Sequence, residues 1–325
     1  MATIEVSTWA QLRSAITSAV AGDVIKLIAD IDCNDEIPEG VTSTIQTIDS
    51  TWFTITGEYT ENDVVKRHEI RNLRTRATSP VTIFKFKSEY TGEPFTVKGI
   101  DFVNLILTAP LAEFYNGSTY SAVANIRIQN CRFTGKRTAN LMKVTKGSYG
   151  NSKIYFERCY LNVVYNGNTA YEQSLLDPYT LSSPIGHMTY CRIRETFTGT
   201  YTPTPSEDNT NSSVYFMALS GCRVEGEIVS GEKARYHAIN ILGNYTPTIQ
   251  NVYDVDFKLT NNTDTSVPLY AFKGVVKVPI RKKGAESTTY TISSASTGVI
   301  LADESQMQDT DWLIQQGFDV VPSDT

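Results

Sequence analysis

The residues of this chain that could perform metal-assisted chemistry are carboxylates that alternate along the sequence. Asp254 and Asp256 are separated by one residue, so in a strand both carboxylates would lie on one side. A Ca²⁺ ion that assists proton abstraction must be held by several oxygens, with a basic residue nearby to take the proton. Arg223, rather than a third carboxylate, stands at the corresponding position of the preceding sequence repeat. A solvated sheet face, or an ion pair between Asp256 and Arg223, is therefore favoured over a Ca²⁺ site. The sequence predicts no metal and no cofactor.

Acid–base chemistry has one candidate group, centred on a histidine. His187 precedes an apolar position, so alternation predicts that it faces outward. Glu157 or Glu195 from a neighbouring repeat could pair with it as a general acid or base. A surface histidine without a catalytic role is the competing interpretation. The chain has no phosphate-binding glycine loop, zinc spacing or Ser–His–Asp signature.

A column of arginine and tyrosine residues is a candidate binding surface. Arg132, Tyr160, Arg192 and Arg223 occupy equivalent positions of successive repeats, with Asp101 before them and Asp256 after them. Arginine and tyrosine are enriched in recognition surfaces. Such a column could hold an acidic glycan or a protein partner. The alternative is a sheet face that is simply covered by long polar side chains.

Tyrosines in polar loops form a second candidate binding set. Each stands in a loop rich in glycine, serine, threonine or asparagine, shortly before the chain returns to a core strand. Rigid aromatic rings among small polar residues are typical of binding loops, although stacked rings could instead shield the core at the corners. The members are Tyr90, Tyr120, Tyr149, Tyr179 and Tyr245.

The element that must position these residues is a repeat of about thirty residues. Each repeat carries a triplet with apolar first and third members, which is the period of a strand. A third apolar column lies three residues upstream, at Val97, Ile128, Phe156, Met188, Leu219 and Val252. One strand group per repeat, with turns between, indicates a solenoid. The triplets are Ile100-Asp101-Phe102, Cys131-Arg132-Phe133, Cys159-Tyr160-Leu161, Cys191-Arg192-Ile193, Cys222-Arg223-Val224 and Val255-Asp256-Phe257.

Two earlier coils and further sheets extend this series. Ile70 and Leu73, and before them Ile45 and Ile48, are expected to continue the apolar columns, with Leu73 and Ile48 aligned on Ile100. Apolar-rich segments between the triplets predict a second and a third sheet. These segments are residues 82–86, 111–114, 141–144, 238–241 and 269–272.

The first residues read as a capping helix. Thr8 as N-cap and Gln11 at the third helical position have capping-box form. Trp9, Leu12, Ile16 and Ala19 follow helical spacing, and Gly22 is expected to end the helix. A strand over residues 24–27 comes next. Residues 311–318 read as a last short helix and a closing turn.

The chain has five cysteines, and four of them share one column. A metal or redox stack is one interpretation, and small apolar filler of the core is the other. In-register neighbours point in parallel, which is poor disulfide geometry, and no CxxC spacing occurs. We expect Cys131, Cys159, Cys191 and Cys222 to be packing residues.

This combination resembles the right-handed parallel β-helix superfamily, the pectate-lyase-like fold. The resembling residues are 6–12 together with 22–27, and coil repeats of the type Asn130-Cys131-Arg132-Phe133. The resemblance implies a single-stranded, right-handed solenoid of about 8–10 coils, all-β apart from an N-terminal capping helix and a short C-terminal cap. It implies little about activity, since the superfamily includes lyases, hydrolases, adhesins and phage spikes.

Composition sets the remaining bounds. The 325 residues show no linker, so one domain over 1–325 is expected, with a cap at 1–30, coils at 40–302 and a cap at 303–325. The net charge of −6 argues against nucleic acid as a partner, and no apolar run could span a bilayer. The first residues lack the basic and apolar regions of a signal peptide.

Two functional classes follow from these expectations. The favoured one is a non-enzymatic structural or binding protein on the exterior of a phage particle, such as a head decoration, fibre or tail spike. Its partners would be other capsid or tail proteins and a host surface glycan, and the sequence leaves both a homo-oligomer and a docked monomer open. The alternatives are a polysaccharide lyase or hydrolase, and a bacterial surface protein.

Overall fold

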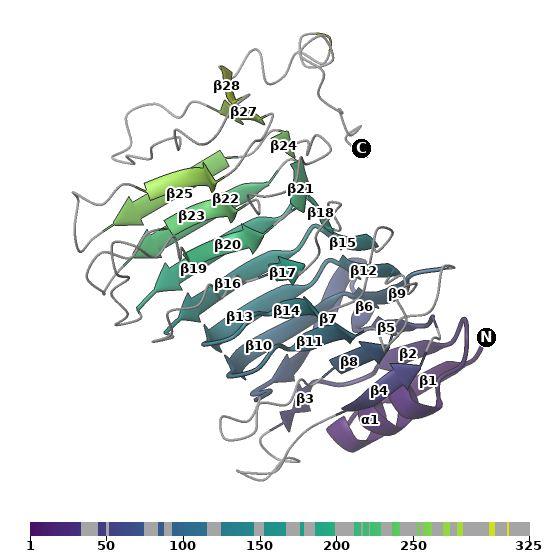
Figure 1. The fold of residues 1–325 in the computed structure, drawn as a ribbon. Helices are drawn as coiled ribbons and strands as arrows, with labels where there is room; N and C mark the ends of the chain where they lie inside the picture. The colour runs from purple at the N-terminus through teal and green to yellow at the C-terminus, as the bar shows by residue number, and fades with distance from the viewer. Residues whose placement is uncertain are drawn as a thin grey trace.

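In the computed structural model, the chain winds repeatedly through three parallel β-sheets, which we call sheets A, B and C (Figure 1). The structure describes residues 1–33, 45–49, 52–74, 84–87, 93–115, 125–145, 153–166, 176–178, 186–198, 211–215, 217–220, 222–228, 236–240, 252–253, 256–261, 269–273, 278–281, 299–302 and 311. Figure 1 shows the strands stacked as rungs from the helix α1 at the N-terminal end towards β25.

Sheet A contains β1 (Thr3–Val6), β2 (Val24–Leu27), β5 (Thr54–Thr56), β9 (Phe95–Lys98), β12 (Asn125–Gln129), β15 (Lys153–Glu157), β18 (Gly186–Thr189), β21 (Met217–Ser220) and β24 (Val252–Tyr253). Sheet B contains β3 (Ile31–Asp32), β7 (Val64–Arg71), β10 (Ile100–Leu107), β13 (Arg132–Arg137), β16 (Tyr160–Tyr165), β19 (Arg192–Phe197), β22 (Arg223–Ile228) and β25 (Asp256–Asn261). The strand β6 (Glu58–Glu61) pairs with β7.

Sheet C contains β4 (Ile45–Asp49), β8 (Phe84–Lys87), β11 (Ala112–Tyr115), β14 (Met142–Thr145), β17 (Leu176–Pro178), β20 (Asn211–Tyr215), β23 (Tyr236–Asn240) and β26 (Leu269–Lys273). A further pair is formed by β27 (Val278–Arg281) and β28 (Val299–Ala302). Along the chain, strands of sheets A, B and C alternate from β2 to β26. Each coil therefore adds one strand to every sheet, and the predicted parallel β-solenoid is confirmed.

The apolar columns predicted for the coils are in register. Ile128 lies opposite Val97 and Phe156, and the same column continues through Met188, Leu219 and Val252. In sheet B, Phe102 lies opposite Phe133 and Phe133 opposite Leu161. The stacked rings of Phe102 and Phe133 have centroids 4.9 Å apart. All five cysteines are buried free thiols, as expected of packing residues.

The two earliest coils have a different register from the expected one. Ile70 lies opposite Phe102, so the position aligned on Ile100 is His68 rather than Leu73. Ile45 and Ile48 belong to sheet C, where they pair with β8, and not to the column of Ile100. The antiparallel hairpin of β6 and β7 is not part of the sequence repeat. It changes the number of residues between the apolar positions of these coils. The spacing of the apolar residues in the sequence does not show this change of register.

The N-terminal cap combines a strand with the predicted helix α1 (Trp9–Ser18). Thr8 is the N-cap, and its hydroxyl accepts a hydrogen bond from the Gln11 amide at 3.2 Å. The Gln11 carboxamide bonds the Ser7 amide at 2.8 Å rather than that of Thr8, so the capping box is shifted by one residue. Gly22, with φ +85°, forms the turn into β2 and does not end the helix, whose C-cap is Ala19.

The C-terminal cap expected at residues 303–325 lies outside the described residues except for Asp311, which is helical. Across the described ranges, no helix has both the length and the apolar character needed to cross a bilayer.

Candidate functional site

The outer face of sheet B carries the column that the sequence predicts. Strands β10, β13, β16, β19, β22 and β25 pair so that its six residues lie opposite one another in order. We call Arg132, Tyr160, Arg192 and Arg223 the arginine–tyrosine strip. Its members face outward because the residues on either side of them along each strand are buried. The expected alignment of the strip is therefore confirmed.

Tyr160 lies between two cations at the centre of this strip. The guanidinium carbon of Arg132 lies 5.3 Å from the centroid of its ring, and that of Arg192 lies 5.7 Å from it. The two arginines come from the strands on either side of β16, so they approach the ring from opposite sides. Cation–π contacts at exposed sites contribute about 0.5–1 kcal/mol each. One ring thus restrains two exposed guanidinium groups.

Glu225 organises the other end of the strip. Its carboxylate lies 3.1 Å from Arg192 Nη2 and 2.7 Å from Arg223 Nε. Burial acts to raise the pKa of Glu225, but the two guanidinium groups outweigh burial and lower this pKa below its ordinary value. The expected partner of Arg223 was Asp256, which lies opposite it in the ladder. The contact that the structure describes for Arg223 is with Glu225, and the Asp256 side chain lies outside the described part.

The acidic end of the column is covered by the hairpin of β6 and β7. Arg67 Nε lies 2.7 Å from an Asp101 carboxylate oxygen. Burial raises the pKa of Asp101 above its ordinary value, although Arg67 and Arg132 act to lower it. At the base of the hairpin, Glu58 pairs with Lys98 at 2.9 Å. The hairpin therefore neutralises the Asp101 end, and among the described side chains of the column the exposed charge is that of the arginines.

The predicted acid–base group is only partly brought together. His187 lies opposite Tyr155 in the ladder between β15 and β18, and Glu157 lies two residues further along β15 on the same face. The His187 side chain lies outside the described part. Glu157 is bonded to Gln129 Nε2 at 2.5 Å and lies 3.5 Å from Arg127 Nε. Glu157 is thus already engaged by neighbours of sheet A.

The prediction that Glu195 pairs with the outward-facing His187 is wrong. Glu195 is 0% exposed, lies on sheet B, and points into the solenoid, where it pairs with Arg137. Alternation from the buried Ile193 places it on the inner face. That signal was present in the sequence, but an acidic residue is seldom assigned to a core without a visible partner.

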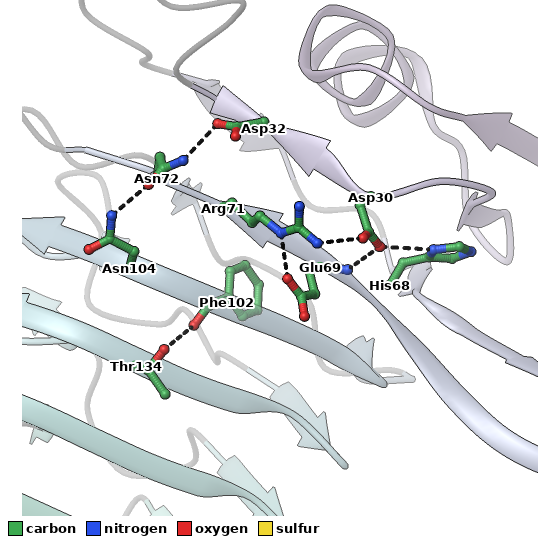
Figure 2. Close-up of polar contacts among 9 residues, drawn as sticks. All are labelled: Asp30, Asp32, His68, Glu69, Arg71, Asn72, Phe102, Asn104 and Thr134. Atoms are coloured by element: carbon green, nitrogen blue, oxygen red, sulfur yellow. Dashed lines mark hydrogen bonds and ion pairs between the residues drawn. The ribbon is translucent and has the colours of Figure 1, made fainter.

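Sequence reasoning missed a polar cluster at the first coils (Figure 2). Asp30 accepts hydrogen bonds from the Glu69 amide at 3.0 Å and from Arg71 Nη2 at 2.8 Å, and lies 3.2 Å from His68 Nδ1. Tyr59 stacks on His68 with ring centroids 4.4 Å apart. Sequence separation hides this cluster, which only the ladder between β3 and β7 brings together.

The Asp30 cluster is a clamp between coils rather than an acid–base pair. Burial acts to raise the pKa of Asp30, but the Glu69 amide, His68 and Arg71 outweigh burial and lower it below the ordinary value. A carboxylate held in its charged form by these donors is a poor proton donor near neutral pH. Beside it, Asn72 donates to Asp32 at 2.8 Å and accepts from Asn104 at 2.6 Å, which links three successive coils (Figure 2).

The remaining candidates lie outside the described residues. These are Asp254 and the loop tyrosines Tyr90, Tyr120, Tyr149, Tyr179 and Tyr245. Within the described ranges, no three histidine, cysteine, aspartate or glutamate side chains are grouped as metal ligands.

Comparison of the chain with models of protein families, with curated protein sequences and with solved structures found no match. The geometry of the described residues therefore carries the functional argument.

Proposed function

We propose that this protein is a non-enzymatic binding protein whose arginine–tyrosine strip holds an acidic glycan. The observation that carries the proposal is the position of Tyr160 between the guanidinium groups of Arg132 and Arg192. Guanidinium groups bind carboxylates through charge-assisted hydrogen bonds, often in pairs. The apolar faces of sugar rings pack against aromatic rings. An arginine–tyrosine–arginine series offers both kinds of contact.

The solenoid makes this surface rigid before a ligand arrives. Strip residues stand on hydrogen-bonded strands whose inner neighbours, such as Phe133, Leu161 and Ile193, are 0–1% exposed. Binding to a preorganised surface loses less conformational entropy than binding to a loop. The chain as a whole carries a net charge of −6, so attraction to an anion depends on this local surface and not on bulk charge.

We place this binding protein on the exterior of a phage particle, among capsid or tail proteins. The support is the resemblance of the capping segment and the coil repeat to the β-helix superfamily, in which phage spikes are represented. A head decoration, a fibre and a tail spike each present a rigid surface to the host, and a host surface glycan is the corresponding ligand. Co-sedimentation of this protein with intact particles in a lysate is the expected result, and its absence from purified particles would contradict this placement.

The binding experiment compares one double variant with one matched control. Arg132→Ala with Arg192→Ala removes both cations from Tyr160, and calorimetric titration with polygalacturonate measures the affinity. We expect a loss of about tenfold or more, because hydrogen bonds to charged groups contribute about 1.5–3 kcal/mol each. Arg127→Ala is the control, since Arg127 lies 5.6 Å from the Tyr155 ring in a similar pair on sheet A. Equal affinities in wild type and double variant, or no binding by the wild type, would contradict the proposal.

A glycoside hydrolase is the second candidate, and one observation favours it. Asp101, at the end of the strip, has a raised pKa because of burial, and Glu69 lies opposite it on β7. A carboxyl with a raised pKa beside a second carboxyl is the arrangement that glycosidic hydrolysis uses. Release of reducing ends from a bound polysaccharide, lost in Asp101→Asn, would replace the binding protein with this enzyme.

A further inference from the structure

At the corner between sheets A and B, four successive coils each place one residue in the left-handed backbone region. Gly99, Asn130, Arg158 and Tyr190 have φ values of +60°, +52°, +53° and +53°. The amide groups of the first three donate to carbonyl oxygens of the next coil at 2.9, 3.0 and 2.9 Å. These four residues therefore form a continuous stack, which we call the corner column.

The residue types in the corner column divide into two groups. Glycine adopts the left-handed region at little steric cost, and asparagine is enriched there, so Gly99 and Asn130 suit the backbone. Bulky side chains are disfavoured in this region because their Cβ atoms crowd the following carbonyl oxygen. Arg158 and Tyr190 nevertheless occupy two consecutive positions. Conformational strain of this kind concentrates at binding and catalytic sites.

Both side chains reach the solvent. Arg158 is exposed, and Tyr190 has 39% of its surface exposed. Neither forms an ion pair or a hydrogen bond with another side chain of the described residues. A glycine or an asparagine would satisfy the same backbone at lower cost, and the exposed parts of Arg158 and Tyr190 are available to a ligand.

The corner column runs beside the arginine–tyrosine strip. Arg158 is two residues before Tyr160, and Tyr190 is two residues before Arg192, with a buried cysteine between the members of each pair. All four side chains therefore lie on the outer surface. Each of these two coils presents one arginine and one tyrosine, and the order of the two types reverses from one coil to the next.

We propose that Arg158 and Tyr190 are the second half of the glycan site, and that the ligand is a linear anionic glycan lying along the solenoid axis. This inference rests on the proposed function of the strip. Successive coils are about 4.8 Å apart, close to the length of one sugar residue in an extended chain. On the coils of Arg158 and Tyr190, one sugar per coil would then meet a cation and an aromatic ring. Arg158 binds a carboxylate or sulfate group, and the Tyr190 ring packs against a sugar face.

The experiment uses substitutions that suit the backbone. Arg158→Gly and Tyr190→Gly remove the side chains while relieving the left-handed strain, so the folded protein is expected to gain thermal stability. Titration with oligosaccharides of polygalacturonate is expected to show about a tenfold loss of affinity in each variant. Dextran of the same length is the neutral probe, and Arg127→Ala removes an arginine from the neighbouring sheet as the control.

The outcomes separate this inference from the function on which it rests. Wild-type affinity in both glycine variants, with affinity lost in Arg132→Ala with Arg192→Ala, would overturn the corner site and leave the strip intact. A lower thermal midpoint in the glycine variants would also overturn it, because the two side chains would then be structural. Absence of binding by the wild type would overturn both.

Discussion

Arg137 and Glu195 form an ion pair inside the solenoid, although 58 residues separate them in the sequence. Arg137 lies on β13 and Glu195 on β19, so the pair reaches across β16. Arg137 Nε donates to Glu195 at 2.7 Å, and the guanidinium carbon lies 4.8 Å from the Tyr165 ring of the intervening coil. The two side chains are 1% and 0% exposed. The interior of this part of the solenoid therefore contains a fully desolvated pair of charges.

Removing one partner of this pair is expected to destabilise the fold strongly. Glu195→Gln would leave the guanidinium group of Arg137 buried without a counter-charge, which costs about 3–5 kcal/mol. The free energy of unfolding, measured by urea denaturation, checks this expectation.

Replacing both partners tests whether charge or shape is required. Arg137→Met with Glu195→Leu fills a similar volume without charge, and most of the lost stability is expected to return. A double variant no more stable than Glu195→Gln would contradict this account. Glu61→Gln, at the exposed pair of Glu61 and Lys66 on the hairpin, is the control and is expected to leave the midpoint unchanged.

The cysteine column is expected to be chemically inert in the native protein. Burial raises the pKa of the Cys131 and Cys191 thiols well above the ordinary value, and the thiolate is the reactive form. Labelling with Ellman's reagent at neutral pH should therefore be at least about a hundredfold slower in native than in unfolded protein. Fast labelling of even one thiol in the native state would show that the column opens locally.

Acid is expected to weaken the clamp at the first coils. The folded-state pKa of Asp30 lies below its ordinary value of 3.8, so the contribution of Asp30 is fully present above that value and is lost as the pH falls through the folded-state pKa. The thermal midpoint should fall more steeply in wild type than in Asp30→Asn between about pH 5 and about pH 2. Asp63→Asn, at the exposed tip of the hairpin, should retain the wild-type slope. If the thermal midpoint fell equally steeply with pH in wild type and in Asp30→Asn, the Asp30 cluster would not act as a clamp between the coils.

A variant with improved binding follows from the contacts of Glu225. Glu225→Gln removes the counter-charge of Arg192 and Arg223, so both guanidinium groups become more available to an anionic ligand. We expect an affinity for polygalacturonate about fivefold higher and a steeper decrease with salt. Glu157→Gln on sheet A is the matched control. Weaker binding by Glu225→Gln would mean that Glu225 holds the arginines in their binding geometry.

The sequence predicts the later coils well because their apolar residues recur without interruption. From Val97 onward, the columns and the strip that they position have the expected register. The earlier coils were misaligned because the hairpin of β6 and β7 changes the spacing, and Ile70 and Leu73 satisfy two alignments equally well.

From the sequence, only those residues of the proposed binding site whose positions follow from the register of the apolar columns could be predicted. Arg132, Tyr160 and Arg192 follow from the column, whereas the corner residues Arg158 and Tyr190 required backbone angles. A residue in the left-handed region leaves a sequence signal when it is glycine or asparagine. An arginine or a tyrosine in this region gives no such sequence signal. For this reason Arg158 and Tyr190 could not be predicted as part of the site from the sequence.

The unbroken column of sheet A has a consequence for how this chain can change in evolution. It runs from Ile25 through Ile55, Val97, Ile128, Phe156, Met188 and Leu219 to Val252. One residue inserted into a strand would exchange its buried and exposed faces, whereas a duplicated coil would keep every column in line. Duplication or deletion of whole coils therefore keeps the columns of this molecule in line, and each added coil would extend the outer surface by one further binding position.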